Sequence, residues 1–231
     1  MISLEAEKIF EIFGFSVTNT ILTSWLAIIF LSFIFFRLNK NLSKFPSKFQ
    51  LIFEIIFENL QSFLKSILNE HLSPRTLAFI LTFFIFILFS NWLGVFPGVG
   101  SIYLQKDHHH IPLFRSPYSD LNMTLTLALI SVIGTNLLGI YHLGSNFLKR
   151  YLNPVGVLEI FGELAKILSF SFRLFGNIFA GEVLLTVVFK LFAFIFPIPF
   201  IGLEMFVGLI QAVIFTVLTT IFLKVALSEE H

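Results

Sequence analysis

The sequence SFSFRLFGNIFAGEVLL, residues 169–185, is apolar except for two charged side chains, Arg173 and Glu182, and a few small polar residues. It lies inside a longer apolar segment, residues 157–196. As a helix this segment would measure about 60 Å, whereas the hydrocarbon core of a bilayer is about 30 Å thick. The segment therefore predicts a membrane helix that is either broken or steeply inclined against a partner. Charges inside a bilayer cost about 2.5–3.5 kcal/mol each and usually serve a function, so Arg173 and Glu182 are functional candidates.

The composition of the whole chain is that of an integral membrane protein. Of its 231 residues, 56% are hydrophobic and 13% are charged, and the mean hydropathy is +0.91. Soluble domains carry about 25% charged residues. The net charge of +1 argues against a nucleic-acid partner, and the absence of cysteine excludes disulfides and thiolate metal sites. Residues 1–14 have no basic region before their first apolar run, so we expect no cleavable signal peptide.

Five apolar segments are candidates for membrane spans, since a spanning helix needs about 20 mostly apolar residues. Pro197 and Pro199 predict a hairpin turn between the last two of them. The predicted fold is an all-α integral membrane protein, one membrane domain over residues 1–231, whose last two helices form a long, steeply tilted hairpin. Residues 1–19 precede the first span, and the five spans are residues 20–36, 76–96, 122–143, 157–196 and 200–227.

Residues 48–71 predict an additional helix with one polar stripe. Its polar side chains recur at steps of three or four residues, and apolar side chains fill the other faces. Such a helix is suited to lying in the membrane interface, and a packed connecting helix is the alternative. The stripe consists of Glu54, Glu58, Gln61, Lys65 and Asn69.

The distribution of basic residues predicts the orientation of the chain. Residues 37–75 contain six lysines and arginines within the predicted loop and amphipathic segment, whereas the N-terminal segment is acidic. Cytoplasmic loops carry an excess of Lys and Arg. With five spans, we expect the N-terminus outside and the C-terminus in the cytoplasm.

Charged and polar residues of the last two spans fall on defined helix faces. Glu159, Glu163, Lys166, Arg173 and Asn177 share one side of the first helix, while Glu182 turns to roughly the opposite side. In the last helix Glu204 and Gln211 share a face.

Depth in the membrane separates these groups. If Arg173 and Gln211 lie at one level of an antiparallel pair, Glu182 and Glu204 come together nearer the outer surface. Glu159 then lies toward the cytoplasm. The arginine stands between two carboxylate regions that are not continuous with each other.

This arrangement is suited to proton transfer. Buried carboxylates can bind and release protons, and a close pair such as Glu182 and Glu204 shares one proton rather than ionising together. Arginine stays protonated, so Arg173 cannot relay a proton and acts as a gate. The alternative is that Arg173 only pairs with a glutamate for packing.

Several other residues have an ordinary structural interpretation. Gln211 and Asn177 could form interhelical hydrogen bonds, and Gly176, Ala180 and Gly181 could allow close helix packing. Lys166 and Lys190 could extend to the interface, and we assign them no chemistry. A metal site at residues 108–110, three adjacent histidines, competes with a solvated loop. We expect no metal and no cofactor.

At these residues the sequence closely resembles subunit a of the rotary F-type ATP synthase in its bacterial form. SFRLFGNIFAGE resembles the family signature RLFGNxxAGE, its most specific motif. VTNTILTSWL resembles the first span, FSNWLGVFPG the end of the second and DLNMTLTLAL the start of the next. LIQAVIFTVLTTIFL and the terminal SEEH resemble the last helix and tail, so the resemblance covers nearly the whole chain.

The resemblance implies a function and a role for each candidate. Subunit a is the stator of the membrane motor, and its inclined last helices face a ring of c subunits. Arg173 takes the position of the essential arginine that faces the ring carboxylate. Glu182 takes that of the outer-channel acid and Glu204 a position where some members carry histidine. The remaining matches are Gln211, which faces the arginine, Asn177 at the motif asparagine and Glu159 in the cytoplasmic channel.

The resemblance also implies partners and a location. The chain would pass protons, with Na⁺ as the alternative ion, and would be no enzyme on its own. Its partners would be the c ring, the peripheral stalk b subunits, the F1 catalytic head and membrane lipid, in a bacterial inner membrane. The competing hypotheses are a self-contained secondary transporter, for which no repeat of the RLFGN segment is found, and a structural membrane anchor.

Overall fold

The computed structural model describes residues 6–12, 14–40, 46–68, 73–96, 102–106, 109–144, 147, 156–191 and 196–227. Each of the five predicted spans coincides with a helix long and apolar enough to cross a membrane, which confirms the all-α integral membrane fold. These helices are α1 (Asn19–Lys40), α3 (Pro74–Val95), α4 (Leu121–Leu143), α6 (Gly156–Leu191) and α7 (Pro197–Leu227).

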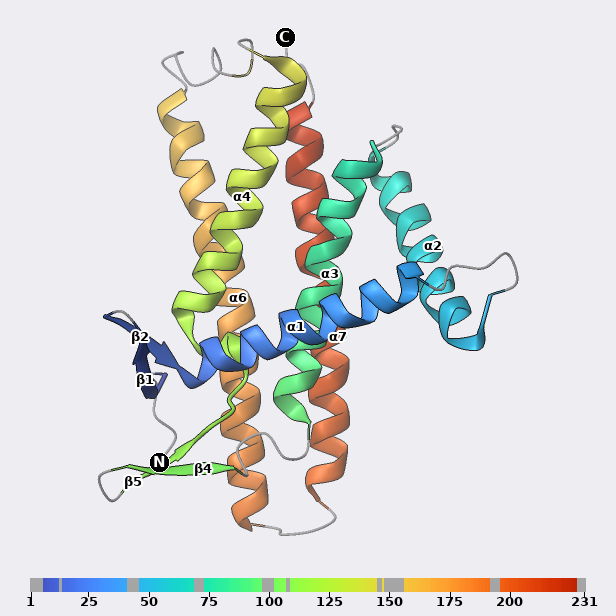
Figure 1. Ribbon diagram of the computed structural model, residues 1–231. Helices are drawn as coiled ribbons and strands as arrows, with labels where there is room; N and C mark the ends of the chain where they lie inside the picture. The colour runs from blue at the N-terminus through green and yellow to red at the C-terminus, as the bar shows by residue number, and fades with distance from the viewer. Residues whose placement is uncertain are drawn as a thin grey trace.

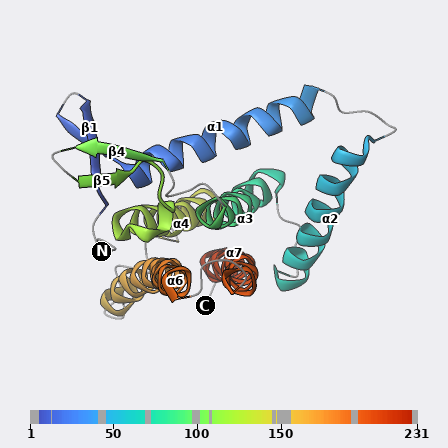
Figure 2. The ribbon, with the colours of Figure 1, turned by 90° about the horizontal axis from the view of Figure 1, so that it is seen from below.

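The long helices are arranged in three layers. Viewed from below, α3 and α4 form the middle layer, with α1 on one side and α6 and α7 on the other (Figure 2). The four helices α3, α4, α6 and α7 run alongside one another, whereas α1 runs across them (Figure 1). Because α1 crosses the other four, all five cannot lie along one membrane normal.

Helix α6 is continuous over its 36 residues. A helix of this length measures about 54 Å, well above the thickness of the hydrocarbon core. Of the two alternatives for the long segment, a broken helix is therefore excluded for residues 156–191. Helix α7 begins at Pro197, so both prolines lie in its first turn, where a missing N–H costs no hydrogen bond. Residues 192–195 of the expected segment lie outside the described residues.

Helix α2 (Lys48–Leu68) forms where the polar stripe predicts a helix, and it lies beside the far end of α1 (Figure 1). Residues 69–71 of the predicted helix lie outside the described residues. Two short antiparallel hairpins were not predicted. They pair β1 (Lys8–Ile12) with β2 (Phe15–Thr18) and β4 (Tyr103–Lys106) with β5 (His109–Pro112).

The core lies where α3, α4, α6 and α7 meet. Phe170 of α6 stacks on Phe215 of α7 with ring centroids 4.4 Å apart, and Phe83 of α3 packs on the same Phe215. Large apolar side chains on the outer faces, such as Phe33 and Leu137, are exposed. Outward-facing apolar side chains of this kind fit a lipid surround.

Candidate functional site

Arg173 lies near the middle of α6, at the edge of a face that no other described helix covers. Its guanidinium donates one hydrogen bond, from Nη2 to Ser169 Oγ at 3.3 Å. Its neighbours Ser169, Phe172 and Gly176 are exposed, and a Cβ added to Gly176 would meet no atom within 4 Å. Among the described residues, Arg173 has no carboxylate partner within ion-pair distance. The side chain therefore borders an uncovered surface of the chain.

The structure does not join Arg173 to its two expected polar partners. Asn177 lies one turn further along α6 and is half-buried, and Gln211 is half-buried on α7. Within the described part of the chain, neither side chain is hydrogen-bonded to Arg173. A common role of these three residues stays a prediction.

Glu182 is held by Arg115, an arginine that lies outside every predicted span. Arg115 donates from Nη2 and from Nε to Glu182 Oε2, at 3.0 and 3.3 Å. The arginine side chain is 9% exposed and the glutamate side chain 21% exposed. This is a largely buried ion pair between α6 and the segment that precedes α4.

Hydrogen bonds from α1 position the segment that carries Arg115. The amide of Arg115 donates to Thr23 Oγ1 at 3.2 Å, and Asn19 Nδ2 donates to the carbonyl of Pro112 at 3.3 Å. Thr20 donates to Asp120 Oδ2 at 3.2 Å, and Asp120 Oδ1 caps α4 by accepting from the amide N–H of residue 122. The crossing helix α1 thus holds the segment that carries Arg115 in place beside Glu182.

Glu204 lies next to Glu182, on the neighbouring helix. A Cβ added to Gly181 would come within 2.7 Å of Glu204 Cδ, so the Glu204 carboxyl group rests on the backbone of Gly181. Its Oε2 is buried and accepts no hydrogen bond from any described residue. The structure therefore brings two carboxyl groups and one arginine to the same end of the α6–α7 pair.

Helix α3 fixes α7 at this level. Asn91 is buried and donates from Nδ2 to the carbonyl of Gly208 at 2.9 Å. Trp92 donates from Nε1 to the carbonyl of Met205 at 3.0 Å. These two hydrogen bonds join α3 to α7 just beyond Glu204 and fix the position of α7 along the axis of α3. In the short helix η1 (Pro117–Ser119), burial raises the pKa of the Tyr118 phenol, so the phenol is neutral.

A second charged group lies at the other end of α6. Glu163 pairs with Lys166 at 2.6 Å and accepts from Asn136 Nδ2 at 3.1 Å. Lys166 also lies over the ring of Phe222, at 4.7 Å from its centroid. Lys166 is therefore engaged inside the helix assembly through these contacts. Glu159 lies one turn before Glu163 and is half-buried.

The carboxylates lie on opposite sides of Arg173 along α6. Glu159 precedes it by fourteen residues and Glu182 follows it by nine. At 1.5 Å per residue these intervals are about 21 and 14 Å along the helix axis. Two polar contacts on α4 lie between them, Thr124 with Ser171 at 3.0 Å and Ser131 with Thr219 at 2.9 Å.

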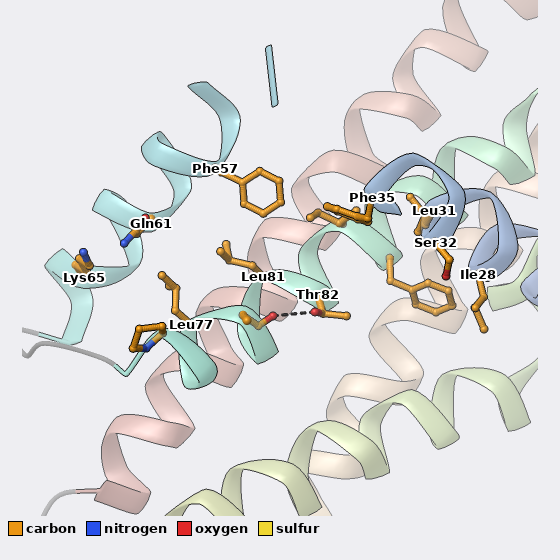
Figure 3. A pocket seen from close by; sticks show the side chains of 14 residues that line it. Ile28, Leu31, Ser32, Phe35, Phe57, Gln61, Lys65, Leu77, Leu81 and Thr82 are labelled. Atoms are coloured by element: carbon orange, nitrogen blue, oxygen red, sulfur yellow. Dashed lines mark hydrogen bonds between the residues drawn. The ribbon is translucent and has the colours of Figure 1, made fainter. Parts of the chain in front are cut away.

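One cavity is remote from these charges. It has a volume of about 780 Å³ and lies between α1, α2 and α3 (Figure 3). Leu31, Leu81 and Phe57 contribute to its apolar lining, and Gln61 and Lys65 of α2 lie at one side. The expected histidine site falls partly outside the described residues: His109 and His110 lie in β5, and residue 108 is not described.

Comparisons with known proteins give one consistent result. Residues 21–224 match the family model described as ATP synthase A chain. The chain is 38% identical over 155 residues to ATP synthase subunit a of Syntrophobacter fumaroxidans, an alignment that covers 64% of this chain and 59% of that relative. It is 36% identical over 170 residues to the subunit a of Mycobacterium bovis, covering 69% of this chain and 67% of the relative. It is 31% identical over 234 residues to the chloroplastic ATP synthase subunit a of Stigeoclonium helveticum, covering 100% of this chain and 93% of the relative.

Proposed function

Because the chain belongs to the ATP synthase A chain family, as subunit a of the membrane sector, we propose that it forms two offset half-channels for protons. One would lead from outside to a rotating ring of c subunits, and the other from the ring to the cytoplasm. The carboxylates carried by the ring would pick up protons from the first and release them into the second. Proton flow would in this way drive rotation and ATP synthesis in the attached catalytic head.

The observation that carries this proposal is the position of Arg173. It lies at an uncovered face of a membrane helix and has no carboxylate partner among the described residues. An arginine facing lipid without a counter-charge is costly, which favours a partner that covers it with an acidic group. A ring of c subunits with membrane carboxylates is such a partner. Since arginine does not give up its proton, Arg173 would hold the passing carboxylate ionised and block direct leakage between the half-channels.

The two half-channels follow from the charges on either side of Arg173. The outer one would contain Glu182 and Glu204, which lie together at one end of α6 and α7. The inner one would contain Glu159, at the other end of α6. Asn177 and Gln211 would line the surface near the arginine. No step requires a cofactor, and the chain alone would not be an enzyme.

The shape of the molecule supports the inclined arrangement. If α1 crosses the bilayer along its own axis, the four helices that it crosses must be strongly tilted (Figure 1). Arg37 and Lys40 at the end of α1 and Arg75 at the start of α3 lie on the side of α2, away from the N-terminal strands. By the positive-inside rule that side is cytoplasmic, which puts the N-terminus outside. We infer that the C-terminus is cytoplasmic, that the complex lies in a bacterial inner membrane, and that b subunits and lipid cover other faces of the chain.

The decisive experiment measures ATP-driven proton pumping in membrane vesicles that carry Arg173→Ala. The matched control is Lys190→Ala, which removes an exposed cation from the last turn of the same helix. We expect Arg173→Ala to lose pumping while ATP hydrolysis by the assembled complex persists, and Lys190→Ala to pump normally. Normal pumping by assembled Arg173→Ala would refute the proposed gate.

A further inference from the structure

Arg115 adds one positive charge to a site in which two carboxyl groups were expected. It comes from the segment before η1, while Glu182 comes from α6 and Glu204 from α7. The neighbours from α3 at this level, Asn91 and Trp92, do not titrate. One arginine and two carboxyl groups carry no net charge when they hold one proton, and a low-dielectric interior favours the uncharged cluster.

The geometry divides the two carboxyl groups into different roles. Two nitrogens of Arg115, Nε and Nη2, donate to one oxygen of Glu182, and the arginine is largely withdrawn from solvent. Breaking such a pair leaves a buried charge without compensation, so Glu182 remains a carboxylate. Glu204 has no cationic partner among the described residues and rests on bare backbone at Gly181. It is free to change protonation state without breaking an ion pair.

We propose that Arg115 is a positioning residue of the outer half-channel, which holds Glu182 as a fixed carboxylate and leaves Glu204 as the group that exchanges the proton. This inference rests on the proposed function. In the transfer step the O–H bond of the Glu204 carboxyl breaks and an O–H bond forms on a ring carboxylate. A hydronium ion from the outer water then returns a proton to Glu204 and becomes water, and the Arg115–Glu182 pair neither gains nor loses a proton.

The test is a double-mutant cycle in the intact ATP synthase. Arg115→Gln removes the cation that pairs with Glu182. Glu182→Gln removes the carboxylate that pairs with Arg115, so the arginine can attract the Glu204 carboxyl instead. We expect each single substitution to reduce pumping per assembled complex by at least about tenfold. The double variant Arg115→Gln/Glu182→Gln replaces both charges with amides that can hydrogen-bond, so it should pump faster than either single variant.

Two further variants separate a charge effect from a general loss of structure. Adding Glu204→Gln to the double variant should abolish the recovered pumping, because the exchanging carboxyl is then gone. Arg115→Lys keeps the positive charge and should retain more pumping than Arg115→Gln. Assembly is measured for every variant. If a single variant does not assemble, the loss of pumping on adding Glu204→Gln to the double variant carries the test.

Three results would overturn the inference. They are a double variant that pumps no faster than the faster of the two single variants, continued pumping after Glu204→Gln in the double background, and Arg115→Lys as impaired as Arg115→Gln. The Arg173→Ala measurement distinguishes these from a failure of the proposed function. If Arg173→Ala abolishes pumping and the double variant shows no recovery, the gate stands and only the role of Arg115 is wrong.

Discussion

The carboxyl group of Glu204 on α7 rests on the backbone of Gly181 on α6, one residue before Glu182. A glycine is required at this contact because a Cβ would occupy the space of the Glu204 side chain. Residues 180–182, with the sequence AGE, therefore supply both the Glu182 carboxylate and the space for the Glu204 carboxyl group of the opposing helix.

Gly181→Ala should displace the Glu204 carboxyl, since the new Cβ would lie 2.7 Å from Glu204 Cδ. We expect pumping to fall by roughly tenfold or more, because small misplacements of a reacting group are costly. Gly202→Ala is the matched control: it lies two residues from Glu204, and a Cβ there meets no atom within 4 Å. Equal pumping by the two variants in vesicles would show that the contact is unimportant.

Asn91→Ala should loosen the grip of α3 on α7. The substitution removes the buried hydrogen bond to the Gly208 carbonyl and leaves a small void. We expect a loss of about 1–3 kcal/mol in the free energy of unfolding, measured by denaturant titration in detergent. Trp92→Phe removes a bond at a more exposed position and should cost less. A larger loss for Trp92→Phe would contradict this order.

Gly134→Ala should overpack the contact between α4 and α3. Its Cβ would collide with the Phe79 ring, coming within 2.9 Å of Cε2. Overpacking of this kind costs about 1–3 kcal/mol, and the smaller side chain of Phe79→Leu should restore part of the loss in the double variant. Thermal unfolding of the three variants in detergent gives the answer. An unchanged midpoint for Gly134→Ala alone would count against the close contact.

Cysteine crosslinking should map the face around Arg173, and the chain contains no cysteine of its own. Gly176→Cys places a thiol on the exposed face of α6, one turn from the arginine. We expect it to crosslink to cysteines placed in a c-type subunit of the assembled complex. Ala128→Cys is fully buried on α4 and should not react. Failure of the exposed position against several ring positions would argue against the ring-facing surface.

Hydropathy was sufficient to predict the membrane helices, because apolarity over about 20 residues is a local property of the chain. The polar stripe of residues 48–71 was likewise sufficient for α2. The sequence did not predict the two β-hairpins. The strands β1 and β2 are only five and four residues long, too short for an alternation of polar and apolar residues to be recognised. Their turn at Gly14 has a positive φ of 83°, and this glycine was the one available signal.

The helix register alone indicated that Glu182 and Glu204 lie at similar depth, and the structure brings them together. The helix register could not indicate that Arg115 pairs with Glu182, because Arg115 is 67 residues from Glu182 in the chain and lies outside every predicted span. The segment PLFRSPYSD contains an arginine among apolar and small residues, a composition that suggests burial more than solvent exposure. The surroundings of Lys166 could not be predicted from the sequence either. Its partner Glu163 is hydrogen-bonded to Asn136, and this contact depends on how α4 packs against α6.

The buried polar end of α1 has a consequence for biosynthesis. Asn19, Thr20 and Thr23 enter the membrane with the first helix, yet three of the groups that they bind belong to Pro112, Arg115 and Asp120. About ninety residues must be synthesised before those bonds can form, so the first helix stays incompletely satisfied while α2 and α3 are inserted. The hydrogen bonds that hold the Arg115 segment beside Glu182 therefore form late in synthesis. A nascent chain that stops after α3 would leave the amide and hydroxyl groups of α1 unpaired, and these would be a signal for chaperones or proteases.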